Sequence, residues 1–305
     1  MARRLCDEAV RERSDVTASS FCWPWGRNLL VWQSARARAA RLAPLGTPGL
    51  NDPRRDRVGL EVPGGHSESL RRVPGRTSER ERGTPDERLV SFLAPSSFEA
   101  EQYRGLRHLV EESGKHVVGI TSPIPGDGKT TTAVNLAGAL AQAPGTRVLL
   151  VEADLRRPRI WDQLGLDGSD ARGLADAIAD DRLTLPDVVR HLPRFNLSVL
   201  PAGRSPASPY EALHSSRLDE LLEEARSHYA YVVVDTPPVV PVPDCRLIAR
   251  LVDGFLILVG AHRTRRELLQ EALAALDSTK ILGLVFNGDD RRRRGYYGYG
   301  YYSRH

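Results

Sequence analysis

The sequence predicts an α/β domain with a doubly wound, mostly parallel sheet, and three observations lead to this fold class. Apolar runs of strand length recur after residue 96, and they are continuous rather than alternating, as in strands buried on both faces. Segments with helical apolar spacing separate these runs. The alternation continues to residue 290, which is typical of one sheet covered by helices on both sides.

Individual helices and strands can be assigned to segments of the chain. Two helices stand out, Thr131–Gln142 and Thr264–Leu276, because apolar residues recur three and four positions apart in each. The apolar runs that predict strands are His116–Thr121, Arg147–Val151, Leu197–Leu200, Tyr231–Asp235, Phe255–Gly260 and Ile281–Phe286.

Composition divides the chain into three parts. Residues 1–95 are rich in Arg, Pro and Gly and lack a sustained apolar period, so we expect them to be disordered. Residues 96–290 form the α/β domain, and residues 291–305 form a flexible tail of Arg, Gly and Tyr. The aromatic stretch Phe21–Trp32 is the exception in the first part. It predicts a short helix without a role, or a contact with a membrane surface or a partner.

The charge is unevenly distributed. The chain has 43 basic and 39 acidic residues, and only three of the basic ones are lysines. The excess of positive charge lies in the first 90 and the last 15 residues, while the residues between them are net acidic. The net positive charge of the chain therefore comes from its two terminal segments. We expect no specific nucleic-acid partner for the domain between them.

Three cysteines, Cys6, Cys22 and Cys245, exclude a disulfide scaffold and fit a reducing compartment. Met1–Arg13 mixes arginines with acids and has no apolar core, so a signal peptide is not expected. The stretch Phe21–Trp32 is too short and too interrupted to span a membrane, which needs about 20 apolar residues. These features predict a cytoplasmic protein.

The strongest motif is Ser122–Thr130, which follows one expected strand and precedes one expected helix. Gly126 and Gly128 allow the backbone to turn tightly with its N–H groups facing inward, and a helix N-terminus completes the phosphate cradle. Lys129 is suited to the β- and γ-phosphates and the Thr130 hydroxyl to Mg²⁺. The sequence therefore predicts a P-loop nucleotide-binding fold that takes ATP and Mg²⁺.

Two further strands end in carboxylates. Glu152 and Asp154 close one apolar run, and Asp235 closes another. Because ligands of open parallel sheets bind beyond the carboxyl ends of the strands, all three acids are expected at the edge that carries the phosphate loop. Thr130, Asp154 and Asp235 are the expected Mg²⁺ ligands, directly or through water. Either Glu152 or Asp154 is expected to accept a proton from the group that receives the phosphate, and the sequence does not separate the two.

The motifs together resemble the bacterial tyrosine kinases (BY-kinases) of capsule and exopolysaccharide synthesis. The resemblance rests on the loop Pro125–Thr132, on Glu152–Pro158, on Leu200–Gly203 and on Asp235–Pro238, and it extends from about Ser97 to Tyr302. It implies that Pro125–Thr130 is Walker A, Val148–Asp154 Walker A′ and Val232–Asp235 Walker B. The implied activity is ATP-dependent autophosphorylation on tyrosine that regulates polysaccharide synthesis and export.

Further site residues follow from this resemblance. The expected nucleotide-binding residues are Pro125, Gly126, Asp127, Gly128, Lys129, Thr130, Thr131 and Asn287, and the expected catalytic residues are Lys129, Glu152, Asp154 and Asp235. Asn287 matches the position that contacts adenine, although a turn asparagine at a strand end explains it equally well. The expected phosphoacceptors, modified in trans, are Tyr296, Tyr297, Tyr299, Tyr301 and Tyr302. Without the kinase-like core, the same tail would be interpreted as a segment that adheres to nucleic acid.

The resemblance also implies partners. A motif for contact between copies in a homo-oligomeric ring is matched by Glu101, Arg104 and Arg107. The alternative is a solvent-exposed helix face, on which each ion pair within the helix stabilises it by about 0.2–0.5 kcal/mol. A separate transmembrane activator, or polysaccharide co-polymerase, and an opposing phosphotyrosine phosphatase are expected as well. The activator would hold the protein at the inner face of the membrane.

Two departures from the family pattern are visible. The first acid of Walker A′ is usually Asp, and here it is the longer Glu152. No transmembrane activator domain is fused ahead of the kinase region, so we expect the stand-alone type. The alternative function is a non-kinase ATPase switch of the partition or septum-placement class, but its signature lysine, five positions before Lys129, is replaced by Ile124.

Overall fold

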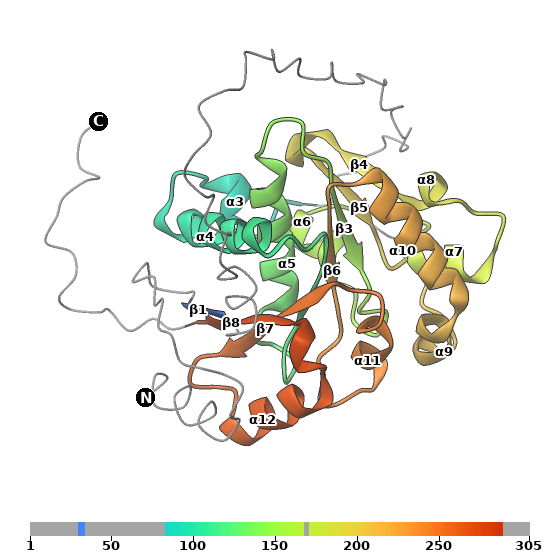
Figure 1. The fold of residues 1–305 in the computed structure, drawn as a ribbon. Helices are drawn as coiled ribbons and strands as arrows, with labels where there is room; N and C mark the ends of the chain where they lie inside the picture. Colours follow the sequence, from blue (N-terminus) through green and yellow to red (C-terminus); the bar gives the residue numbers. More distant parts are fainter. Residues whose placement is uncertain (1–29, 34–82, 168–170, 289–305) are drawn as a thin grey trace, which may run out of the picture.

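The computed structural model describes residues 30–33, 83–167 and 171–288, and an eight-stranded sheet lies at the centre of these residues (Figure 1). The strand order is β1-β8-β7-β2-β6-β3-β5-β4. The strands are β1 (Leu30–Gln33), β2 (Val117–Thr121), β3 (Val148–Glu152), β4 (Arg190–Leu192), β5 (Leu197–Leu200), β6 (Tyr231–Asp235), β7 (Gly254–Gly260) and β8 (Ile281–Asn287).

The six inner strands are parallel, and both edge strands are antiparallel to their neighbours. Every residue of β2, β3 and β7 is buried, which explains why the sequences of these strands are continuous apolar runs. Successive residues of one strand point into different cores: Leu149 packs in one apolar cluster and Leu150 in the other. The sheet therefore separates two hydrophobic cores.

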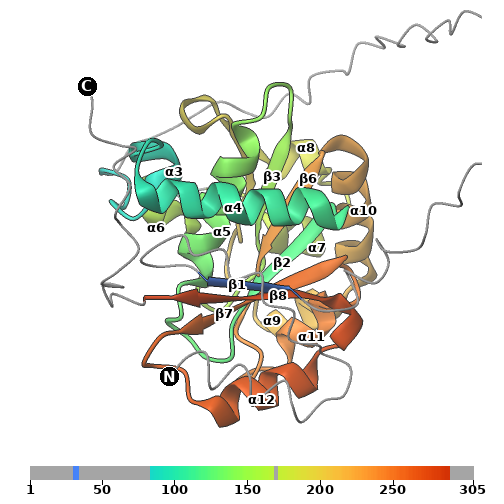
Figure 2. The same ribbon diagram turned by 60° about the vertical axis from the view of Figure 1, so that its left-hand side comes forward.

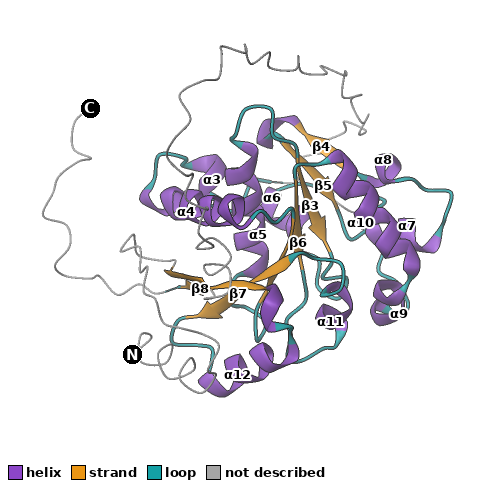
Figure 3. Ribbon diagram, viewed as in Figure 1, coloured by secondary structure: helices purple, strands orange, loops and turns teal. Residues whose placement is uncertain are grey.

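Helices cover both faces of the sheet, as Figures 1 and 2 show. One core is closed by α3 (Val90–Leu93), α4 (Phe98–Ser113), α5 (Lys129–Ala141) and α6 (Ile160–Leu164). The other is closed by α7 (Leu174–Ala179), α8 (Leu185–Val188), α9 (Pro209–His214), α10 (Ser216–His228), α11 (Asp244–Ile248) and α12 (Arg266–Ala275). The resulting three layers, helix, sheet and helix, confirm the predicted fold class (Figure 3).

The predicted strands and the two predicted helices are present, with boundaries that differ by one or two residues. For example, β2 begins at Val117 rather than His116. The start of α5 was predicted at Thr131, and the structure places it at Lys129 and thus inside the phosphate loop. Short antiparallel β4 was not predicted, because three residues carry no period.

The expected domain boundary at residue 96 is wrong, because residues 83–95 belong to the folded domain. Leu89 is fully buried, and the side chain of Asn135 in α5 bonds to the Arg88 carbonyl and the Ser91 N–H. The ring of Phe92 lies against Gly138, where an added Cβ would come within 2.4 Å of it. These contacts are made by side chains far apart in sequence, and a local composition argument does not reveal them.

A second difference concerns the aromatic stretch Phe21–Trp32. Its last residues form β1 rather than a helix, and β1 pairs antiparallel with β8, with Leu30 opposite Phe286 and Gln33 opposite Gly283. Edge strands present unpaired backbone groups that a further strand can satisfy, which accounts for this pairing. Residues 1–29 and 34–82 lie outside the described residues, as do residues 291–305 of the predicted tail.

Candidate active site

The phosphate loop follows the carboxyl end of β2 and leads directly into α5. Gly126 and Gly128 have φ angles of +88° and +93°, in the left-handed region that favours glycine. Gly128 precedes the first helical residue, Lys129, and no side chain caps the helix start. The N–H groups of the first turn are thus left for an anion, as in other phosphate-binding helix N-termini.

Strand pairing brings the predicted carboxylates to this edge. Asp235 is opposite Ile120 of β2 on one side and Glu152 of β3 on the other. The Asp235 side chain is 1% exposed, and its Oδ1 has no hydrogen-bond partner among the described residues. Burial raises the pKa of Asp235 to about 7, although hydrogen bonding to Thr130 and the charge of Lys129 act in the opposite direction. A buried carboxylate in this state is well suited to gain a cation.

The structure gives the carboxylates of Glu152 and Asp154 different surroundings, whereas the sequence did not distinguish the two. The Glu152 carboxylate accepts hydrogen bonds from three backbone N–H groups: Oε1 from Arg159 at 2.5 Å and Ile160 at 2.6 Å, and Oε2 from Ala202 at 3.1 Å. Arg159 and Ile160 begin α6, so Glu152 acts as a remote cap of that helix. Burial raises its pKa, and the three bonds partly offset this effect.

Asp154 is bound less tightly. Its Oδ1 accepts a hydrogen bond from the Arg157 N–H at 3.2 Å. Burial raises the pKa of Asp154, whereas the charge of Lys129 and hydrogen bonds from the Arg157 and Arg156 N–H groups lower it. Lys129 is itself buried, with 7% of its surface exposed. Of the two Walker A′ acids, Asp154 therefore has the carboxylate that is available to a substrate or a cation.

Asn287 lies against the phosphate loop rather than at a distance from it. Its Nδ2 donates to the Asp127 carbonyl at 2.9 Å, and an added Cβ on Gly128 would come within 2.2 Å of that nitrogen. Asn287 therefore contacts the phosphate loop, and its contact with adenine stays a prediction. The Thr131 hydroxyl accepts a hydrogen bond from Gln163 of α6.

Sequence reasoning missed an ion pair beside the Walker motifs. Arg156, two residues after Asp154, forms two hydrogen bonds of 2.6 and 3.0 Å with Asp244 at the start of α11. Asp244 is buried, and the pair is bidentate, the geometry that guanidinium and carboxylate groups favour. The pair fixes the segment after β3 to the segment after β6. The repeated arginines of 156–159 were the only signal for it in the sequence.

The remaining predicted residues lie elsewhere. Glu101, Arg104 and Arg107 share α4, where Arg104 bonds to Glu101 and to the Pro95 carbonyl, and Arg107 bonds to Glu111 and to the Ala139 carbonyl. The structure therefore ties this face to its own chain and does not test a contact between copies. The five predicted phosphoacceptor tyrosines of the tail are outside the described residues.

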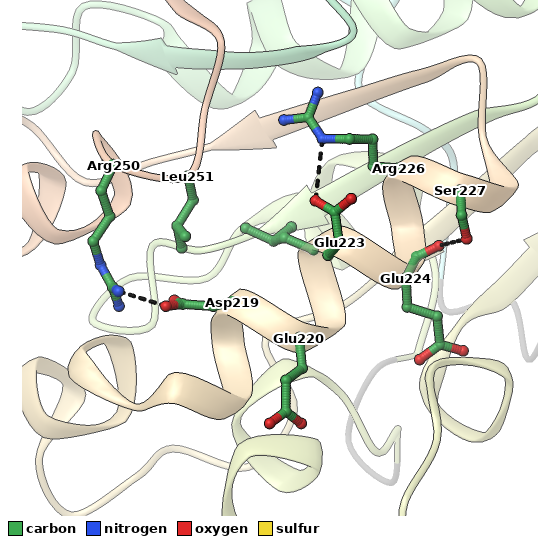
Figure 4. Close-up of a pocket in the computed structure, with 9 residues that line it drawn as sticks. Asp219, Glu220, Glu223, Glu224, Arg226, Ser227, Arg250 and Leu251 are labelled. Atoms are coloured by element: carbon green, nitrogen blue, oxygen red, sulfur yellow. Dashed lines mark hydrogen bonds and ion pairs between the residues drawn. The ribbon is translucent and has the colours of Figure 1, made fainter.

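A separate hollow of about 710 Å³ lies beside α10 (Figure 4). Its acids include Asp219 and Glu223, which pair with Arg250 and Arg226. Arg226 also bonds to Asp253, the residue before β7, so the hollow is near the sheet edge opposite to the phosphate loop. It does not belong to the candidate active site.

The residues at the phosphate loop fit MgATP. The two left-handed glycines and the uncapped start of α5 fit a phosphate, and the unpartnered Oδ1 of Asp235 fits a cation. Mg²⁺ commonly takes one or two carboxylates together with phosphate oxygens and water, and Asp154 and Asp235 provide two. In the described ranges, no set of three or more His, Cys, Asp or Glu side chains is placed to hold a metal ion.

Fold and site together define a P-loop nucleotide-binding α/β domain. A family model described as an AAA domain matches residues 116–249. Tyrosine-protein kinase YwqD of Bacillus subtilis (strain 168) is 34% identical, over 72% of this chain and 94% of YwqD. The chain therefore belongs to the bacterial tyrosine-protein kinases.

Two further proteins are similar to the chain. The kinase domain of Escherichia coli tyrosine kinase ETK superposes with a TM-score of 0.64 at 29% identity, covering 73% of this chain and 88% of that domain. Succinoglycan biosynthesis transport protein ExoP of Rhizobium meliloti (strain 1021) is 32% identical over 70% of this chain, which spans only 28% of ExoP. Among the helices of the described residues, none is long and apolar enough to cross a membrane.

Proposed function

We propose that this protein is an ATP-dependent protein-tyrosine autokinase that phosphorylates the C-terminal tyrosine cluster of a neighbouring copy. The observation that supports the proposal is a phosphate loop with two left-handed glycines beside the buried carboxylate of Asp235, in a chain 34% identical to a tyrosine-protein kinase. Five tyrosines at the C-terminus, Tyr296, Tyr297, Tyr299, Tyr301 and Tyr302, provide the acceptors.

The roles of the residues follow from their environment. The loop N–H groups and Lys129 bind and orient the phosphates, and positioning together with charge stabilisation supplies most of the catalysis in phosphoryl transfer. Mg²⁺ bound with ATP neutralises charge on the transferring phosphoryl group. Thr130, Asp154 and Asp235 hold the cation, directly or through water. Asp154 also accepts the tyrosine proton, because both oxygens of Glu152 are occupied by backbone N–H groups.

The cellular role is polysaccharide synthesis and export. ExoP, which matches this chain over the kinase region, is named for the biosynthesis and transport of succinoglycan. The partners of the proposed cycle are further copies of the chain in a ring through Glu101, Arg104 and Arg107, a transmembrane co-polymerase that activates the kinase at the membrane, and a phosphatase that removes the phosphate.

A mixing experiment tests whether the protein phosphorylates tyrosine and whether one copy phosphorylates another. The Lys129→Met variant keeps the tail but loses the loop cation, and a variant with all five tail tyrosines changed to Phe keeps the site but loses the acceptors. Incubated separately with MgATP, neither should gain phosphotyrosine. Mixed, the Lys129→Met chain should become phosphorylated, which only transfer between copies can produce. ATP hydrolysis by the wild type without phosphotyrosine would instead support the ATPase-switch alternative.

A further inference from the structure

The loop between β7 and α12 lies against the outside of the phosphate loop. The guanidinium group of Arg263 in this connection donates to the carbonyl oxygens of Gly126 at 3.1 Å and Pro125 at 3.2 Å. These residues are 137 and 138 positions apart in the chain. Arg263 is exposed, so the interaction is not imposed by burial.

Gly126 is the residue that allows this approach. A Cβ added to it would lie 2.3 Å from Nη2 and 2.6 Å from Cζ of Arg263, distances that real Cβ atoms do not show. The glycine thus has two functions. It adopts a left-handed φ of +88°, and it leaves room for the guanidinium group over the loop.

A second contact from the same connection holds the next residue. The Thr264 hydroxyl donates to Asp127 Oδ2 at 2.8 Å and accepts from the Gly260 N–H at 3.1 Å. Asp127 is 2% exposed, and an added Cβ on Gly260 would come within 2.6 Å of its Oδ1. Burial raises the pKa of Asp127, and the Thr264 bond and the charges of Arg263 and Lys129 lower it.

With Asn287, three consecutive carbonyl groups are held from one side: those of Pro125 and Gly126 by Arg263, and that of Asp127 by Asn287. In a trans peptide unit the N–H group points away from the C=O group. No described peptide bond is cis. Fixing these carbonyls outward therefore directs the N–H groups of Gly126, Asp127 and Gly128 to the opposite side, where a phosphate cradle needs them.

We propose that Arg263 is a positioning residue that holds the phosphate loop in its binding conformation before the nucleotide arrives. A glycine-containing loop that is free to sample other conformations must be ordered on binding, and that ordering reduces affinity. Arg263 removes part of this cost through two charge-assisted hydrogen bonds to the loop backbone. The inference rests on the proposed function, because it assumes that the loop binds MgATP.

Arg265 provides a matched control. It is an exposed arginine of the same connection, it precedes the first residue of α12, and its side chain does not cap that helix. Arg265→Ala removes the same charge at nearly the same place as Arg263→Ala. A difference between the two variants therefore reports hydrogen bonding to the loop rather than the general positive field. Arg263→Lys keeps the charge and loses the planar fork.

The first measurement is calorimetric titration of the four full-length proteins with a non-hydrolysable ATP analogue and Mg²⁺. We expect Arg263→Ala to weaken binding about tenfold, which corresponds to about 1.4 kcal/mol, and Arg263→Lys to fall in between. Arg265→Ala should stay within about twofold of the wild type. The phosphorylation rate at saturating ATP should be unchanged in Arg263→Ala, since the residue touches the loop and not the reacting atoms.

The second measurement is amide hydrogen exchange in the nucleotide-free proteins. The segment 122–130 should exchange faster in Arg263→Ala than in wild type and Arg265→Ala. Equal affinity and equal exchange in the two alanine variants would overturn the inference. A wild-type protein that failed to bind the analogue would overturn the proposed function first, and the inference with it.

Discussion

Replacing Glu152 should damage the fold, whereas replacing Asp154 should damage the reaction. Glu152→Ala leaves the backbone N–H groups of Ile160 and Ala202 buried without an acceptor, and that of Arg159 partly so. Each buried unsatisfied group costs about 1–3 kcal/mol, so the two buried groups cost about 2–6 kcal/mol. A protein of this kind has only about 5–15 kcal/mol of stability in total.

Asp154→Asn is the matched change. The amide keeps an oxygen that can accept from the Arg157 N–H, and it removes a carboxylate whose pKa burial has raised, so stability should be unchanged or slightly higher. Phosphotyrosine formation should be lost.

The assay combines a thermal melt with a phosphotyrosine assay on both variants. The loss in Glu152→Ala should lower Tm by at least about 4 °C, since 1 kcal/mol shifts Tm by about 2–4 °C in a domain of this size. Phosphorylation measured well below its Tm should persist. A Glu152→Ala protein that melts like wild type and is inactive would refute the reasoning and make Glu152 the proton acceptor.

The other predictions concern the loop, the boundary, the assembly and pH. Lys129→Met should abolish both ATP binding and phosphorylation; analogue binding near the wild-type level would contradict the site assignment. Deleting residues 1–82 should preserve nucleotide binding, whereas deleting 1–95 should lower Tm because it removes buried Leu89 and the partners of Asn135; equal melting of the two truncations would argue against the corrected boundary. Changing Glu101, Arg104 and Arg107 to Ala should give a monomer in sedimentation that still binds nucleotide, and an unchanged oligomer would reduce these residues to a surface helix face. Burial opposes ionisation of Asp253, but hydrogen bonds from Arg226 and from the N–H groups of Val117 and His116 lower its pKa to about 2. The stability that ionised Asp253 contributes is therefore complete above pH 4 and is lost as pH falls through 2, so Asp253→Asn should destabilise at pH 7 and have little effect at pH 2 in urea melts.

The sequence by itself determined the features that local pattern encodes. Strands buried on both faces must be continuous apolar runs, so β2, β5 and β6 could be predicted within a residue of their ends. The phosphate loop could be predicted because glycines, a lysine and a threonine at fixed spacing have few other uses. Parallel order then placed Asp235 and the Walker A′ acids at the same edge.

The tertiary structure alone decided which backbone and side-chain groups surround each residue at that edge. In the sequence, Glu152 and Asp154 are both acids at the end of the same strand. Their hydrogen bonding differs because Ala202, 50 residues away, and the start of α6 bring backbone N–H groups to Glu152. Arg263 is one of 40 arginines in the sequence, and its contact with Gly126 arises from a crossing of loops 137 residues apart. Hydrogen bonds between distant segments depend on where the sheet order and the helix packing place each backbone group. No periodic pattern or residue spacing in the sequence reveals that placement.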